Sequence, residues 1–71
     1  MLNNRLTEAF PQYRRIWVQY CTLSKRRSEY RAVITLFPLE GTYTMLFSDI
    51  ITDVNFETIS TIIENNLQST N

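Results

Sequence analysis

Apolar positions recur along the chain with two different periods, and the helical period comes first. Residues 3–10 follow the possible caps Asn3 and Asn4 and precede Pro11, which disfavours a helical conformation for the residue before it. Their apolar side chains recur at helical spacing: Leu6, Ala9 and Phe10. This pattern predicts a short first helix.

The last part of the chain has the clearest helical pattern. Asn55 is a natural N-cap, Glu57 is favourable in a first helical turn, and Val54 can pack back against Ile59. The other face of the segment is polar. The apolar positions that share one helical face are Phe56, Ile59, Ile62, Ile63 and Leu67. An amphipathic helix is therefore predicted here.

Three segments between these helices are rich in β-branched and aromatic residues, which is typical of strands: residues 14–23, 30–37 and 42–48. The polar residues 24–28 join the first two and predict a hairpin. Residues 38–41 fit a four-residue turn in which Gly41 supplies a positive φ. The order helix, strand, strand, strand, helix predicts an α+β fold with a three-stranded antiparallel sheet.

The turn lengths also predict how the strands align. Pairing Leu23 with Glu29 places three apolar residues of the first strand and three of the second on one face: Ile16, Val18, Tyr20, Ala32, Ile34 and Leu36. Pairing Phe37 with Thr42 adds Tyr43, Met45 and Phe47 to that face. Both helices can bury their apolar stripes on it. The result is a two-layer sandwich (α-β-β-β-α), with residues 1–71 forming one small domain.

The opposite face of the predicted sheet mixes apolar, arginine and threonine side chains. Contiguous exposed apolar patches on small proteins often mark binding surfaces. We therefore expect a protein-binding surface formed by Trp17, Arg15, Arg31, Phe37, Val33 and Leu46. The alternative is that the first helix crosses to this side and covers it.

A chain of 71 residues forms one small core, close to the margin of independent stability, so a partner protein or a second copy would help it. The only cysteine, Cys21, cannot form an internal disulfide. With no long apolar run and no export signal, we expect a cytoplasmic protein that does not engage membranes. The low content of Ala and Gly is typical of an AT-rich genome, as in a phage or mobile element.

The net charge of zero hides two opposed halves. Residues 1–31 contain all seven cations and two carboxylates, a net of plus five, whereas residues 32–71 contain five carboxylates and no cation. Such asymmetry suggests a polar partner. A candidate nucleic-acid surface consists of Lys25, Arg26, Arg27, Arg14, Arg15 and Tyr30. The alternative is a solvated hairpin end, with the acidic half closing onto the basic half.

The order of the elements is similar to that of a double-stranded-RNA-binding domain. Such domains carry lysines at the start of the second helix, where this chain has Asp53-Val54-Asn55-Phe56-Glu57. They also carry a histidine between the first two strands, and this sequence contains no histidine. The resemblance is therefore limited to element order, and we assign no family.

Catalytic patterns are weak. Without histidine there is no Ser-His or Cys-His pair, and one glycine cannot form a phosphate-binding loop. Asp49 and Asp53 are more readily explained as turn and cap residues than as metal ligands. We expect no enzyme, cofactor, metal site or small-molecule substrate. The favoured function is a small protein-binding module (an inhibitor, adaptor or accessory protein, or a homodimer), and the alternative is a nucleic-acid binder.

Overall fold

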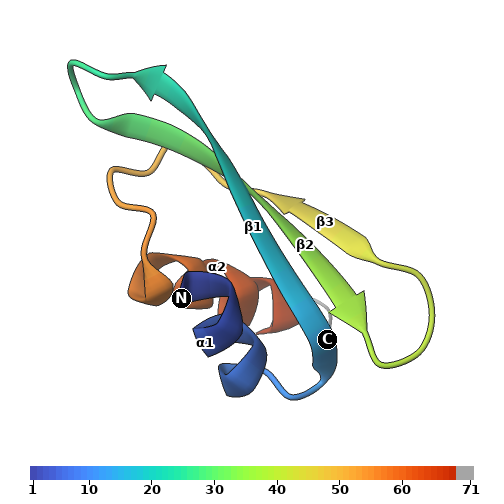
Figure 1. Cartoon of the computed structure of the whole chain (residues 1–71). Helices are drawn as coiled ribbons and strands as arrows, with labels where there is room; N and C mark the ends of the chain where they lie inside the picture. The colour runs from blue at the N-terminus through green and yellow to red at the C-terminus, as the bar shows by residue number, and fades with distance from the viewer. Residues whose placement is uncertain (69–71) are drawn as a thin grey trace.

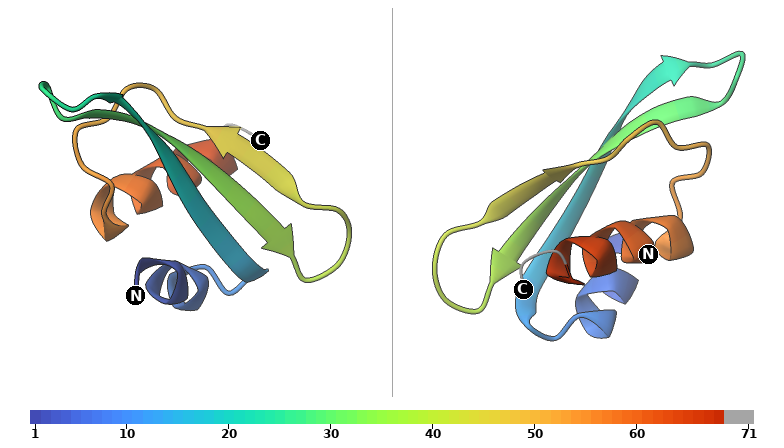
Figure 2. Two further views of the ribbon diagram at one scale, coloured as in Figure 1. Left: turned by 45° about the horizontal axis from the view of Figure 1, so that its top comes forward. Right: turned by 180° about the vertical axis from the view of Figure 1, so that it is seen from behind.

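The computed structural model describes residues 1–68. The elements are α1 (Leu2–Ala9), β1 (Tyr13–Ser24), β2 (Glu29–Pro38), β3 (Thr44–Phe47) and α2 (Phe56–Gln68). The strands form one antiparallel sheet in the order β1-β2-β3 (Figure 1). Both helices lie on the same side of this sheet (Figure 2). The predicted α+β architecture, α-β-β-β-α in two layers, is confirmed.

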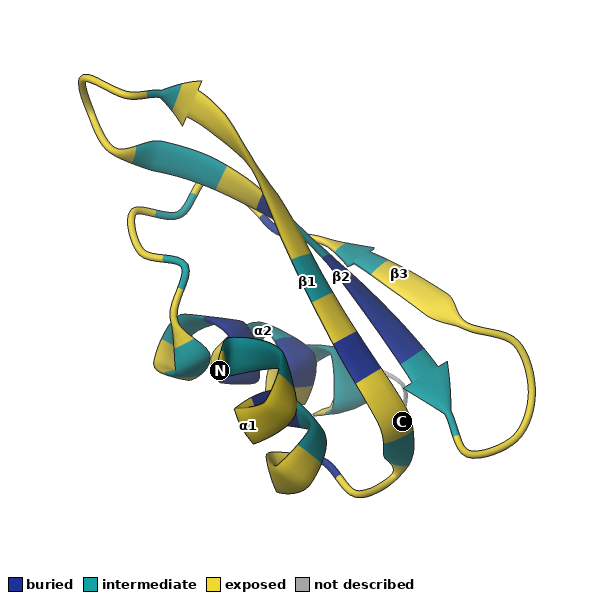
Figure 3. Cartoon of the chain, in the orientation of Figure 1, coloured by how far each residue is buried: buried dark blue, intermediate teal, exposed yellow. Residues whose placement is uncertain are grey.

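The hydrophobic core lies between the helices and one face of the sheet (Figure 3). Its buried residues come from α1, the adjoining loop, β1, β2 and α2: Leu6, Phe10, Ile16, Ala32, Ile34, Leu36, Ile59 and Ile63. Because α1 contributes Leu6 to this core, α1 lies beside α2 and does not cross to the other face. Neither helix of residues 1–68 therefore covers the sheet face that carries Trp17.

The two helices begin differently. Asn55 caps α2 as predicted, since its Oδ1 accepts a hydrogen bond from the backbone N–H of Thr58 at 2.9 Å. The helix α1 has no side-chain cap, and its first residue is Leu2. Asn3 lies inside α1, where its side chain binds the backbone of β1. The expectation that Asn3 or Asn4 caps the first helix is wrong.

The β1–β2 hairpin has the predicted register over most of its length. Trp17 pairs with Thr35 and Ile16 pairs with Leu36. Near the tip a β-bulge between Thr22 and Ser24 shifts the register, so that Glu29 pairs with Ser24 and not with Leu23. The hairpin is twisted and extends beyond the helices (Figure 1).

The predicted register of β3 is wrong by one residue. Ile34 pairs with Leu46, and Leu36 pairs with Thr44, because Pro38 belongs to β2 and residues 39–43 form the connection. Gly41 has the expected positive φ of 100°. A shift of one residue exchanges the two faces of a strand. Leu46 therefore packs against the core, whereas Met45 and Phe47, expected in the core, are exposed.

Candidate binding face

The candidate site is the sheet face that lies opposite the helices, called the open face below. Alternation along β1 and β2 places on it Arg15, Trp17, Gln19, Cys21, Arg31, Val33, Thr35 and Phe37. Thr35 lies at its centre, opposite Trp17 and Met45, and is only 9% exposed. Neighbouring side chains therefore cover Thr35.

Arginine and aromatic side chains are packed together at one end of the open face. The guanidinium carbon of Arg15 lies 4.6 Å from the centroid of the Trp17 ring. The guanidinium of Arg14 lies over Phe37 at 5.6 Å, and its Nε donates a hydrogen bond to the carbonyl of Pro38 at 3.2 Å. The Phe37 and Tyr43 rings are 5.9 Å apart. These cation–π contacts hold each guanidinium in place against a ring.

The third strand contributes different residues from those predicted. Leu46 faces the core and does not belong to the open face. Met45 and Phe47, which are 43% and 67% exposed, take its place. Both faces of β3 carry apolar side chains, so the alternation of its sequence could not distinguish the two registers. The other five predicted residues, Trp17, Arg15, Arg31, Phe37 and Val33, share the open face.

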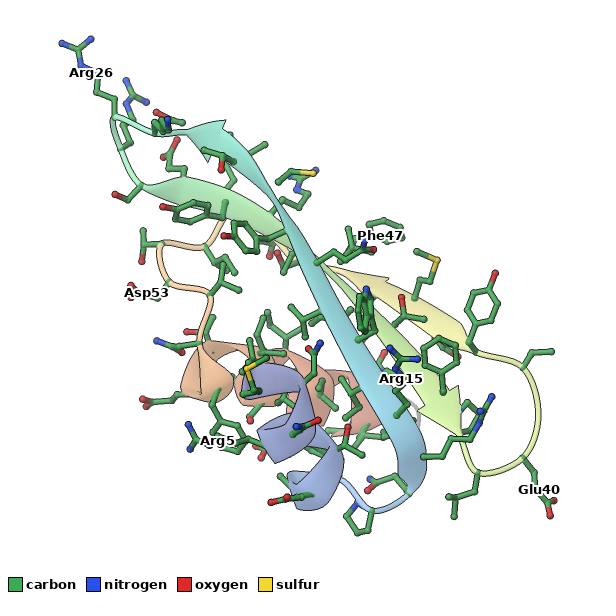
Figure 4. The ribbon with its side chains drawn as sticks, viewed as in Figure 1. Arg5, Arg15, Arg26, Glu40, Phe47 and Asp53 are labelled. Carbon is green, nitrogen blue, oxygen red and sulfur yellow. The ribbon has the colours of Figure 1, made fainter. Side chains whose placement is uncertain are left out.

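The charged side chains of residues 1–68 form no ion pair with one another within 4.0 Å. The cations of the hairpin, Lys25, Arg26 and Arg27, are all exposed. Arg26 points away from the carboxylates of Glu40 and Asp53 (Figure 4). The solvated hairpin end of the alternative interpretation therefore agrees with the structure, whereas no ion pair within residues 1–68 joins the acidic half to these three cations.

The candidate nucleic-acid residues are divided between different surfaces. Arg15 lies on the open face, whereas Tyr30 is half-buried on the helix side and makes an edge-to-face contact with Tyr20 at 5.7 Å. The backbone of Tyr30 also exchanges two hydrogen bonds of 2.8 Å with Ile51. The structure therefore does not bring Tyr30 together with the arginines of the open face.

Side chains of α1 close the outer edge of β1 at Ile16 and Val18, a contact that no local sequence pattern indicates. The backbone N–H of Val18 donates to Asn3 Oδ1 at 3.1 Å, and that of Ile16 donates to Thr7 Oγ1 at 3.2 Å. A groove with a volume of about 460 Å³ follows this junction and reaches Trp17. Edge strands with free backbone groups can pair with other chains. Here α1 protects β1 from such pairing at Ile16 and Val18.

Within residues 1–68, no three side chains of Cys, Asp or Glu gather in a way that could hold a metal ion. Cys21 is a free and exposed thiol on the open face. Of the two helices in the described part of the chain, neither has the length and apolar character needed to cross a bilayer.

Comparisons with models of protein families, with curated proteins and with solved structures find no match to this chain.

Proposed function

We propose that this protein is a non-enzymatic binding module, an inhibitor, adaptor or accessory protein, that holds a protein partner on its open face. The observation that supports the proposal is a sheet face that neither helix of residues 1–68 covers and that carries exposed apolar side chains around Thr35. Trp17, Met45 and Phe47 are exposed there beside half-buried Val33 and Phe37. Apolar groups gathered on one face of a small domain favour contact with another protein.

The polar groups on this face indicate the chemistry of the partner. Arg15 and Arg31 lie on the open face and form no ion pair with other residues of 1–68, and the cation–π contact with Trp17 orients Arg15. The residues 15–23, 31–37 and 43–47 contain no carboxylate. Trp and Arg are enriched among the residues that dominate binding energy. A partner with an acidic rim around an apolar centre complements this face.

The test compares two exposed aromatic residues on opposite sides of β1. Trp17→Ala removes the proposed anchor, whereas Tyr20→Ala removes an aromatic side chain of the helix side that is 57% exposed. A partner captured from the native host by the wild-type protein is then titrated with each variant. We expect Trp17→Ala to weaken binding by about 2 kcal/mol or more, and Tyr20→Ala to leave it unchanged. Equal affinities of both variants would overturn the proposal.

A second candidate function is nucleic-acid binding by the hairpin end. The observation that favours it is that Lys25, Arg26 and Arg27 are exposed and unpaired among the described residues. Cations of this kind neutralise phosphates and release counterions. Labelled single-stranded and duplex DNA and RNA at low salt serve as probes. The triple change to alanine should weaken binding and flatten its salt dependence, whereas Arg5→Ala on α1 serves as the control.

This candidate has a direct negative outcome. If the wild-type protein does not change the anisotropy of any of these probes at low salt, nucleic-acid binding by the hairpin is excluded. That result leaves the proposed protein-binding role of the open face intact, because the three hairpin cations are at least eight residues away from Trp17 along the chain.

A further inference from the structure

The two outer edges of the sheet differ in whether other residues bond to their outward backbone groups. Asn3 and Thr7 of α1 accept hydrogen bonds from two outward backbone donors of β1, those of Val18 and Ile16. The strand β3 has β2 as its only neighbour in the sheet, and no other segment of residues 1–68 runs along its outer edge (Figures 1 and 2). An uncovered edge strand presents a row of free backbone donors and acceptors. In the described structure, β3 is such a strand.

The hydrogen bonds between β2 and β3 show which backbone N–H and C=O groups of β3 point away from β2. The backbone N–H of Ser48 donates to the carbonyl of Ala32 at 2.9 Å, so Ser48 is directed toward β2. Backbone groups of successive residues point to alternate sides of a strand. Leu46 and Thr44 therefore also face β2, whereas the N–H and C=O groups of Met45 and Phe47 face away. The same alternation explains why Ile16 and Val18 meet α1 at the other edge.

We infer that β3 pairs with β3 of a second copy, antiparallel and about a two-fold axis at Leu46. In this register Met45 lies opposite Phe47 of the second copy, and Phe47 lies opposite its Met45. Each of these pairs exchanges two hydrogen bonds, because all the groups involved point outward. The two sheets join into one sheet of six strands with all four helices on the same side, and the open faces become continuous.

The side chains of β3 suit a second copy of the same strand. Residues 41–48 carry no charge, so no like charges meet along the paired strands. Met45 and Phe47, 43% and 67% exposed in one chain, cover each other across the junction on the open face. Two half-buried Leu46 side chains meet at the axis beneath the sheet. Self-complementarity of this kind is what an interface with two-fold symmetry requires.

Cross-linking tests the register directly. All variants carry Cys21→Ser, so that the exposed native thiol does not react. Leu46→Cys places two thiols at a non-hydrogen-bonded pair on the axis, where the Cα atoms are about 4.5 Å apart. Met45→Cys is the control, because the two thiols would then lie on diagonal positions about 7 to 8 Å apart. We expect Leu46→Cys to form the disulfide dimer at least about tenfold faster than Met45→Cys.

A second experiment does not depend on Leu46→Cys folding. An equimolar mixture of the Met45→Cys and Phe47→Cys variants should form the mixed disulfide in preference to either homodimer, since these positions face each other across the junction. The pairing spans only four residues, so we expect a dissociation constant on the order of micromolar or weaker for the wild type. A wild type that sediments as a monomer at millimolar concentration would overturn the inference. Equal rates of mixed and homodimeric cross-linking would also overturn it.

The pairing of β3 and partner binding at the open face share Met45 and Phe47 but differ in their dependence on Trp17. Trp17 lies on β1, two strands away from the junction, so Trp17→Ala should leave the cross-linking rates unchanged. A normal cross-linking pattern together with unchanged partner affinity of Trp17→Ala would reject the proposed function alone. Absence of cross-linking in a variant that still binds its partner would reject the pairing alone.

Discussion

The hydroxyl of Ser48 takes the place of a backbone acceptor for Ala32. The N–H of Ala32 donates to Ser48 Oγ at 2.8 Å, and this hydroxyl donates in turn to the carbonyl of Asp49 at 2.7 Å. The ladder between β2 and the chain after β3 then shifts by one residue, and Tyr30 pairs with Ile51. A single buried hydroxyl thus joins the end of β3 to the segment that leads to α2.

This relationship predicts opposite effects for two buried serines. Ser48→Ala leaves the buried N–H of Ala32 without its acceptor and should lower the free energy of unfolding by about 1 to 3 kcal/mol. Ser60 on α2 is similarly buried, but its Oγ has no hydrogen-bond partner within the described residues. Ser60→Ala should therefore be neutral or slightly stabilising. Urea unfolding of both variants provides the measurement, and equal losses would contradict the assigned role of Ser48.

Ile34→Asp should unfold the domain. Ile34 is fully buried at the centre of the sheet, and the described core offers no cation to pair with a carboxylate there. A core of this size supplies only about 3 to 5 kcal/mol of stability, which is less than the cost of burying an unpaired charge. Val33→Asp is the matched control, since the neighbouring side chain lies on the open face. Cooperative thermal melting by circular dichroism should disappear in the first variant and persist in the second.

The registers of β2 and β3 show which parts of the sheet the sequence pattern can predict. The prediction places Ile34 and Leu36 correctly because, along β1 and β2, apolar residues of one face alternate with residues of a more polar, mixed face. In β3, Met45, Leu46 and Phe47 are consecutive apolar residues, so no alternation distinguishes the faces. The length of the connection between β2 and β3 decides the register. Nothing in the sequence indicates that Pro38 is the last residue of β2 instead of the first residue of the turn. Most of the candidate site was therefore predictable, but its third strand was not.

The contact between Asn3 and Val18 could not be predicted because it joins residues that are 15 positions apart. A preference for helix caps is a local property, and it suggested a local role for Asn3. In the folded chain, the first turn of α1 lies beside an edge strand that has free donors. The tertiary hydrogen bond gives Asn3 a role that local sequence preference cannot indicate.

Removing this edge contact should loosen β1 locally. Asn3→Ala deprives the N–H of Val18 of its acceptor, and water replaces it at the edge. We expect a loss of about 1 kcal/mol in stability and faster hydrogen exchange at the Val18 amide. Asn4→Ala, at an exposed neighbouring position, is the control and should leave that amide unchanged. Unaltered exchange at Val18 in the Asn3 variant would contradict the proposed closing of this edge.

Ile16 and Trp17 are adjacent on β1 and point to opposite faces of the sheet. Substitutions at the two positions therefore distinguish a residue that stabilises the fold from one that contributes to binding. Ile16 is fully buried, and Ile16→Ala should cost about 2 to 5 kcal/mol in folding stability. Trp17 is 39% exposed and contacts Arg15, so Trp17→Ala should cost only about 1 kcal/mol or less. Denaturant titrations of the two variants compare these losses directly.

Tryptophan emission provides an independent check on the same residue, because Trp17 is the only tryptophan in the chain. On the open face its indole is accessible to water, so the monomer should emit at long wavelength and be quenched readily by acrylamide. Binding of a partner over this face should shift the emission to the blue and protect it from the quencher. Pairing of β3 alone should change neither property, because Trp17 lies two strands from that edge. A protected, blue-shifted emission in a dilute monomer would instead place Trp17 in the core and contradict its role in binding.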